Sequence, residues 1–203
     1  MRARESVALA SEPDPSNGYD GIVDAYRAAR SRSGVNVVAE WIKPLKPGAR
    51  ILDLGAGTGQ PLIPVLQAAD LSIFALDASP AMVAAFRAEF PQIEVVCEPV
   101  EESDFFGRKF EAILAIGLVF LLPEEAQIKL LHRISAALLP GGAVLFSAPI
   151  ETGAWQDMLT DQTSQSLGEA AYHKHLLSAG FKAVTHLTDR WGSNYYAAQK
   201  ALP

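Results

Sequence analysis

The sequence has almost no cysteine and no long hydrophobic run. Cys97 is the single cysteine among 203 residues, which excludes an internal disulfide and any cysteine-rich zinc site, and we predict no metal site. Although 49% of the residues are hydrophobic, no run reaches the ~18 apolar residues of a membrane-spanning helix. The apolar patch at residues 7–10 is shorter than the roughly 7–15 residues of a secretory signal. We therefore expect a cytoplasmic protein without a membrane partner.

Basic residues are also scarce. Lys and Arg total 17 against 23 Asp and Glu, which leaves a formal net charge of −6. Binding to nucleic acid usually requires a basic face that neutralises phosphates. Arg27, Arg30 and Arg32 form the only local basic cluster. The charge therefore argues against tRNA, rRNA or DNA as a partner.

The length of the chain favours one domain. A chain of 203 residues can bury a substantial core without dividing. Residues 11–17 are rich in Ser, Pro and acidic side chains, a composition typical of a disordered segment. We predict a flexible lead-in over residues 1–17 and one domain over residues 18–203. The sequence leaves open whether the protein is a monomer or a homodimer.

One stretch carries most of the functional information. An apolar strand at residues 49–54 contains Asp53 and then breaks into Gly55, Gly57 and Gly59. Glycine lets the backbone turn sharply and approach a ligand closely. A second apolar strand ends in another acid, Asp77. A glycine turn after one strand and an acid at the tip of the next indicate a crevice for an adenosine-type ligand.

The glycine spacing separates two cofactors. A dinucleotide fingerprint has glycines at i, i+2 and i+5, and Gln60 occupies the last of these positions when the count starts at Gly55. Glycines at i, i+2 and i+4, preceded by Asp53, instead resemble motif I of the class I S-adenosylmethionine-dependent methyltransferases. Later segments resemble that family in the same order, over about residues 18–200.

The resemblance implies a role for each segment. Asp77 would hold the ribose hydroxyls, and the Val100 backbone with Glu101 or Glu98 would meet the adenine edge. The end of the fourth strand, at Ile116, would lie under the methionine part. Tyr26 and Arg30 would reach the methionine carboxylate. The expected cofactor-binding residues are Gly55, Ala56, Gly57, Gly59, Gln60, Asp77, Ala78, Met82, Val100, Glu101, Ile116, Tyr26 and Arg30.

The hydrophobic periodicity predicts strands that alternate with helices. Such alternation implies a doubly wound, mainly parallel sheet, and the short turn at residues 188–193 suits an antiparallel hairpin. We predict an α/β, Rossmann-like domain with a doubly wound, mainly parallel seven-stranded sheet and an antiparallel last strand. Ser79 is a suitable N-cap before Pro80. The predicted strands are 49–54, 71–76, 93–97, 111–116, 143–148, 181–187 and 194–200, and the predicted helices are 19–30, 34–43, 59–68, 80–89, 124–138 and 167–179.

Four segments are candidates for the acceptor side, each with an alternative role in packing or at the surface. They are the N-terminal helix with Tyr19 and Tyr26, the apolar stretch 117–122 with Phe120, the segment 152–168 with Trp155 and Asp157, and the final hairpin with Trp191, Tyr195 and Tyr196. If the acceptor must lose a proton, the candidate bases are Asp157 and the tyrosines at 195 and 196. We assign no catalytic role to a histidine, since His132, His173 and His175 follow solvent-facing helical positions and His186 has no obvious partner.

The resulting prediction is a methyltransferase that uses S-adenosylmethionine and acts on a small-molecule acceptor by in-line displacement. Orientation of the acceptor against the methyl group can supply up to ~7–11 kcal/mol of the barrier reduction. Two alternatives stay open: a protein methyltransferase, and a noncatalytic cofactor-binding member of the fold. A nicotinamide-dependent dehydrogenase is more remote because of Gln60.

Overall fold

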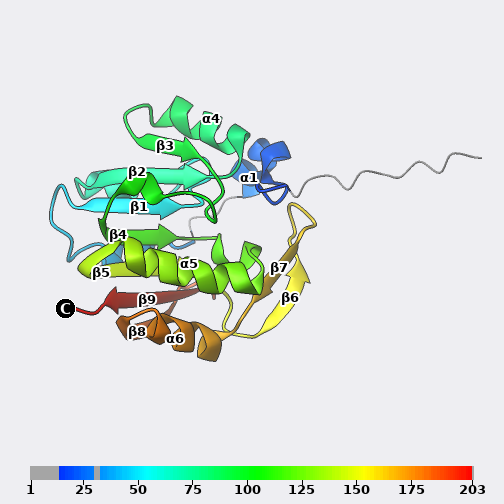
Figure 1. The fold of residues 1–203 in the computed structure, drawn as a ribbon. Helices are drawn as coiled ribbons and strands as arrows, with labels where there is room; N and C mark the ends of the chain where they lie inside the picture. The colour runs from blue at the N-terminus through cyan, green and yellow to red at the C-terminus, as the bar shows by residue number, and fades with distance from the viewer. Residues whose placement is uncertain (1–13, 30–32, 203) are drawn as a thin grey trace, which may run out of the picture.

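The computed structural model describes residues 14–29 and 33–202. Seven strands form the main sheet: β1 (Arg50–Leu54), β2 (Ser72–Asp77), β3 (Glu94–Cys97), β4 (Phe110–Ala115), β5 (Leu138–Ser147), β8 (Phe181–Thr188) and β9 (Asn194–Lys200). Their order is β3-β2-β1-β4-β5-β9-β8 (Figure 1). The first five are parallel, and β9 is antiparallel to both of its neighbours. The predicted fold class is confirmed.

Helices cover both faces of this sheet. One face packs against α2 (Val35–Trp41), α3 (Ile63–Ala68) and α4 (Pro80–Glu89), and the other packs against α5 (Glu124–Ala137) and α6 (Glu169–Ser178) (Figure 1). Successive side chains of a strand point to opposite faces. The apolar residues of the central strands are therefore divided between the two cores.

The start of α4 follows the sequence signal. Ser79 is the N-cap and its hydroxyl accepts a hydrogen bond from the Met82 amide at 3.1 Å, while Pro80 is the first helical residue. Such a cap satisfies one of the amides that a helix leaves unpaired at its N-terminus. The predicted helix 80–89 is confirmed at both ends.

Several boundaries differ from the prediction. The helix expected over residues 19–30 is a 3₁₀ turn, η1 (Tyr19–Gly21), followed by α1 (Val23–Ala29), because Ile22 between them leaves the helical region at φ −129° and ψ 22°. Helix α3 begins at residue 63 rather than 59, since Gly59 has φ +84°. Strand β5 begins at residue 138, five positions before the predicted start at 143.

A second, two-stranded sheet was not predicted. Its strands β6 (Gly153–Gln156) and β7 (Thr163–Ser166) pair antiparallel, with Trp155 opposite Ser164. The sequence signal was weak because β7 reads Thr-Ser-Gln-Ser and lacks an apolar alternation. Both this hairpin and α1 lie beyond the carboxyl ends of the parallel strands (Figure 1). Among the helices of the described residues, none is long and apolar enough to cross a membrane.

Candidate cofactor and acceptor site

The glycine turn after β1 is tied to the neighbouring strand. The amides of Gly55 and Ala56 donate to the Leu76 carbonyl at 2.9 and 3.0 Å. Gly57 has φ +57°, and a Cβ at this position would lie 2.9 Å from the Tyr26 hydroxyl. A side chain at position 57 would therefore fill space at the mouth of the turn. Glycine is required here for both its conformation and its size.

The carboxylate of Asp77, at the end of β2, also binds the glycine turn. One carboxylate oxygen accepts from the Gly57 amide at 2.7 Å, and the other accepts from the Ser79 amide at 2.9 Å. Burial raises the pKa of Asp77, and this effect outweighs the two amide hydrogen bonds, which lower it. A partly buried carboxylate in this position can still accept hydrogen bonds from a ligand hydroxyl through its remaining lone pairs.

The N-terminal turn docks on the start of α4. Asp20 accepts hydrogen bonds at 2.8 Å from the Ser79 hydroxyl and from the Ala81 amide. The carboxylate of Asp20 thus lies at the helix N-terminus, where negative charge is stabilised. This contact brings Tyr19 and Tyr26 over the glycine turn, with their rings edge to face at 5.9 Å.

The loop after β3 forms the adjoining wall. It runs through Pro99, Val100 and Glu101, and α5 supports it from behind. The Arg133 guanidinium donates to the carbonyls of Val100 and Ser103, and it lies 4.6 Å from the centre of the Phe105 ring. Sequence reasoning missed the supporting arginine because its helix is distant along the chain.

These elements enclose a cavity of about 1320 Å³. Nine of the thirteen predicted cofactor residues line it, from the glycine turn, the β2 end, α4, the loop after β3, the β4 end and α1: Gly55, Gly57, Asp77, Ala78, Met82, Val100, Glu101, Ile116 and Tyr26. The agreement concerns position only, and their roles stay predictions.

The other four predicted residues do not appear on the described wall. Gly59 packs against α4, since a Cβ there would lie 2.6 Å from the Phe90 ring. Gln60 points outward and donates to Glu89 at 2.6 Å. Ala56 is buried within the turn. Arg30 lies outside the described residues.

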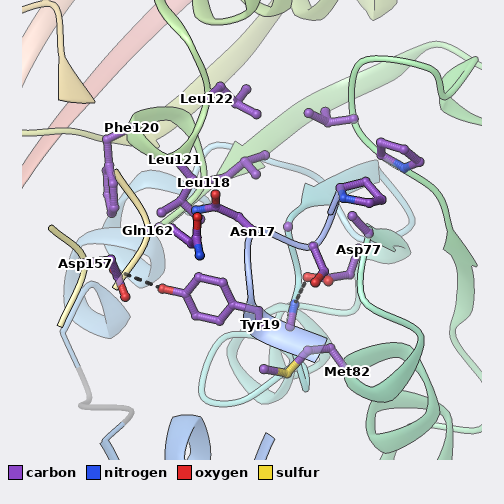
Figure 2. Close-up of a pocket in the computed structure, with 18 of the residues that line it drawn as sticks. Asn17, Tyr19, Asp77, Met82, Leu118, Phe120, Leu121, Leu122, Asp157 and Gln162 are labelled. Carbon is purple, nitrogen blue, oxygen red and sulfur yellow. Dashed lines mark hydrogen bonds between the residues drawn. The ribbon is translucent and has the colours of Figure 1, made fainter. Parts of the chain in front are cut away.

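The far end of the cavity is built by segments that are distant in sequence. Phe120 comes from η3 (Val119–Leu121) after β4, and its ring lies 5.7 Å from that of Trp155 on β6. Tyr19 comes from the N-terminal turn, and Asp157 and Gln162 come from the turn between β6 and β7. Figure 2 shows Tyr19 between Asp77 on one side and Asp157 on the other.

The buried side-chain amide of Gln127 supports the β6–β7 hairpin. Gln127 on α5 donates to the carbonyls of Leu122 and Gln165 at 2.8 and 3.0 Å. Its oxygen accepts from the Tyr172 hydroxyl at 2.7 Å. The first two hydrogen bonds therefore join α5 to the end of η3 and to the hairpin, and the third joins α5 to α6. The segment 152–168 is thus a supported wall of the cavity rather than an ordinary surface loop.

Residues 14–17 belong to the wall as well, although they fall in the predicted flexible lead-in. Asp14 accepts hydrogen bonds from the amides of Ser16 and Gly18 at 2.9 Å, which closes a turn. The Ser16 hydroxyl is the largest cause of the lowered pKa of Asp14. Asn17 extends into the cavity (Figure 2), and its side-chain nitrogen is buried without a hydrogen-bond partner among the described residues. Sequence reasoning did not single out Asn17.

The final hairpin does not reach the cavity. Tyr195 and Tyr196 are 1% exposed and pack in the core, so neither is a base for an acceptor. Tyr195 donates to Asp189 at 2.9 Å, and Trp191 is half exposed beside Arg190. Tyr195 and Tyr196 are consecutive residues of β9 that pack into the cores on opposite faces of the sheet, so packing decided their place.

The histidines also lie away from the cavity. His132 and His173 are exposed, as predicted. His186, in contrast to the prediction, has a partner: its Nε2 lies 3.0 Å from the Asn194 side-chain oxygen across the β8–β9 pair. Within residues 14–29 and 33–202, no group of three or more His, Cys, Asp or Glu side chains is arranged to hold a metal ion.

Comparison with known proteins finds similarity to methyltransferases and to an enzyme named for S-adenosyl-L-methionine chemistry. A family model described as a methyltransferase domain matches residues 51–142, which contain the glycine turn, Asp77 and the loop after β3. A curated relative, the carboxy-S-adenosyl-L-methionine synthase of Ectopseudomonas mendocina (strain ymp), is 32% identical over 155 residues. The match covers 65% of this chain and 61% of the relative. This chain therefore spans about three fifths of the length of that relative.

Solved structures share the fold at low sequence identity. Magnesium protoporphyrin IX methyltransferase from Synechocystis PCC 6803, solved with bound SAM, has a TM-score of 0.74 at 17% identity, with 96% of this chain and 100% of that chain covered. The CcbJ methyltransferase from Streptomyces caelestis has a TM-score of 0.76 at 17% identity, with 94% and 100% covered. Two findings therefore support the resemblance read from the sequence: residues 51–142 match the model of a methyltransferase domain, and the chain shares its fold with solved methyltransferases, one of them with bound SAM.

Proposed function

We propose that the protein transfers a methyl group from S-adenosylmethionine to a small-molecule acceptor. The observation that carries this proposal is the hydrogen bond between the Gly57 amide and Asp77 inside a cavity of about 1320 Å³. It joins the glycine turn to the acid of the next strand at the carboxyl edge of the sheet, where open α/β sheets bind ligands. Ligand pockets usually measure about 300–1,000 Å³, so the cavity has room for a cofactor and an acceptor side by side.

The residues present fit this cofactor. The absence of a side chain at Gly57 leaves a cradle next to the Tyr26 hydroxyl, and the Asp77 carboxylate faces the same space. The buried nitrogen of Asn17 requires an acceptor atom, since an unpaired buried donor costs about 1–3 kcal/mol. A carboxylate oxygen of the methionine part would satisfy it. Asn17 thus joins Tyr26 as a candidate contact to that carboxylate, and Arg30 remains one.

In this mechanism the residues of the chain orient the cofactor and the acceptor rather than make either one more reactive. S-adenosylmethionine supplies a methyl group on a positively charged sulfur, which is a good leaving group. Asp77 and the Val100–Glu101 segment would hold the adenosine part, while Ile116 and Leu118 form an apolar floor beneath the reacting centre. Phe120 and Tyr19 would hold the acceptor in line with the methyl group. Orientation of this kind is the largest contribution that the described residues offer.

A small acceptor is favoured over a protein side chain. The N-terminal turn and the β6–β7 hairpin both contribute residues to the cavity wall, and Tyr19 and Asp157 connect them across it at 3.3 Å. An acceptor must fit beneath this bridge. We further propose that the enzyme works in the cytoplasm, as a monomer or a homodimer.

Calorimetric titration with S-adenosylhomocysteine tests the proposal, with NADH titrated in parallel. We expect micromolar binding of the thioether and none of the dinucleotide. The matched pair of variants is Gly57→Ala and Gly48→Ala. Both positions have positive φ, but a Cβ at Gly48 meets nothing within 4 Å. Binding that survives in both variants, or that is absent from the parent protein, would rule out the proposed cofactor site.

A second candidate function follows from the curated relatives. The relative from Ectopseudomonas mendocina is named for the synthesis of carboxy-S-adenosyl-L-methionine, and its identity of 32% extends over 155 residues. In that case the adenosine contacts would be the same, and the product would be a carboxylated cofactor instead of a methylated acceptor. Mass spectrometry of the small molecules left after incubation with S-adenosylmethionine and a cell extract distinguishes the two. A carboxylated cofactor supports this second candidate, and a methylated acceptor supports the first.

A further inference from the structure

The acceptor end of the cavity combines a carboxylate with aromatic walls. Asp157, Tyr19 and Phe120 line it together, and the Trp155 ring packs against that of Phe120 at 5.7 Å. Aromatic faces attract cations through their quadrupole, and carboxylates attract them through charge. Asp157, Tyr19 and Phe120 are each partly buried, so that a bound group would be shielded from water.

The two oxygens of Asp157 have different surroundings. Oδ1 accepts from the amides of Leu159 and Thr160 at 2.9 and 3.0 Å and from the Thr160 hydroxyl at 3.2 Å. Three local donors therefore fix the carboxylate within its own turn. Oδ2 accepts from the Tyr19 hydroxyl at 3.3 Å, which is long for an O–H···O bond. Oδ2 thus retains lone pairs for a donor supplied by a ligand.

The charged side chains that line the described part of the cavity all carry the same sign of charge. Asp14, Glu101 and Glu102 also line the cavity, together with Asp77. Carboxylates that converge on one cleft with low-dielectric walls focus a negative potential inside it. That potential favours a cationic headgroup at Oδ2 and opposes an anionic one. The negative potential and the aromatic walls therefore both favour a cation.

We propose, on the basis of the proposed function, that the methyl acceptor is a primary or secondary amine on an apolar or aromatic body. Its ammonium group binds to Asp157 Oδ2 beside Tyr19, and its body packs against Phe120 and Leu118.

Methyl transfer to the bound amine conserves atoms and charge. The bound ammonium gives one proton to Asp157, which releases it to solvent, and the nitrogen regains its lone pair. This lone pair forms the new N–C bond while the S–C bond breaks, and the bonding electrons remain on sulfur as a neutral thioether. The product nitrogen keeps its remaining protons and leaves as a methylated ammonium. Each turnover therefore releases one proton.

Three matched probes test the proposal: phenethylamine, 2-phenylethanol and 3-phenylpropanoate, each titrated into the complex with S-adenosylhomocysteine. They share a ring and a chain and differ in the headgroup. We expect the amine to bind about tenfold or more tightly than the alcohol and the acid, because a hydrogen bond between two charged groups is stronger than one to a neutral group and the acid is repelled by the carboxylate. With S-adenosylmethionine in place of the thioether, mass spectrometry is expected to detect N-methylphenethylamine.

The matched variants are Asp157→Asn and Asp161→Asn. Asp161 is exposed on the same turn at φ +56°, a conformation that Asn tolerates, and it is not among the cavity-lining residues. We expect Asp157→Asn to lose the preference for the amine and to retain S-adenosylhomocysteine binding, while Asp161→Asn keeps both. Equal or tighter binding of the alcohol or the acid, no binding of any probe, or an unchanged preference in Asp157→Asn would overturn the amine acceptor. Loss of thioether binding by the parent protein would instead overturn the proposed function and the inference with it.

Discussion

The adenosine side and the acceptor side of the cavity are assembled in different ways. On the proposed adenosine side, the glycine turn, Asp77 and the loop after β3 follow the ends of adjacent parallel strands. Hydrogen bonds donated by backbone amides, two of them to the Asp77 carboxylate, connect them. On the acceptor side, Tyr19, Phe120 and Asp157 come from three segments separated by most of the chain. Side-chain contacts hold these segments together.

This difference predicts which side of the cavity tolerates variation. Strand ends that the sheet aligns keep their geometry whatever the loops contain, so a recurring cofactor can be bound by a recurring motif. The acceptor wall depends on one hairpin and one N-terminal turn, and both can change without disturbing the sheet. We therefore expect substitutions to separate cofactor binding from acceptor binding.

The largest effect is expected at the glycine turn. Gly57→Ala places a Cβ 2.9 Å from the Tyr26 hydroxyl and strains a residue at φ +57°. We expect S-adenosylhomocysteine affinity to fall by roughly 100-fold, or about 2.7 kcal/mol, in a calorimetric titration. Gly48→Ala has the same backbone strain in open space and is expected to bind normally. Equal losses in both variants would attribute the effect to strain alone.

Asp77 is expected to give the next largest effect, and it depends on pH. Ligand hydroxyls donate to the ionised carboxylate, so binding favours the charged form, whereas burial raises the pKa of Asp77 in the free protein. Affinity should therefore rise with pH until the free carboxyl group is fully ionised, and stay constant above that point. Asp77→Asn should bind about tenfold or more weakly and show no such rise. The exposed Asp70→Asn serves as the control, and a pH dependence retained in Asp77→Asn would assign the titration to another group.

A substitution of Gln127, which supports the β6–β7 hairpin, tests the acceptor side alone. Gln127→Met keeps the volume of the side chain and removes its bonds to Leu122, Gln165 and Tyr172. We expect about 1–3 kcal/mol of lost stability in urea unfolding, because buried polar groups lose their partners. Phenethylamine binding should weaken while S-adenosylhomocysteine binding stays unchanged. The exposed Gln67→Met is expected to alter neither. A parallel loss of cofactor affinity would show that the two sides are not independent.

The smallest effect on ligand binding is expected at a residue that lies outside both sides of the cavity. Asp189 accepts hydrogen bonds from Ser33, Ser193 and Tyr195; although burial raises its pKa, these bonds lower it to about 2 from the usual 3.8. A depressed pKa contributes stability above the unfolded-state value, and the contribution is lost as the pH falls towards 2. Asp189→Asn should therefore unfold at a lower temperature above about pH 4, with the difference vanishing near pH 2. Calorimetric scans across this range check it, and both ligand affinities should stay unchanged.

Much of the fold was predictable because its signals are local. The β1 turn carries its glycines in sequence, Ser79 and Pro80 mark the start of α4, and alternating apolar strands predict the layers. The β6–β7 hairpin was missed because its polar strands have no such period, and they are stabilised by Gln127 from another element. Similarly, Tyr195 and Tyr196 appeared suitable for a site but are buried in the core.

The sequence by itself determined the fold class, the edge of the sheet where the cavity lies and the resemblance of its glycine turn to a cofactor-binding motif. These features depend on residues close along the chain and on the alignment of parallel strand ends. Only the tertiary structure decided that Tyr19, Phe120 and Asp157 meet at one end of the cavity and that Asn17 extends into it. The physical reason is that long-range packing, which no local pattern encodes, sets the distances between loops.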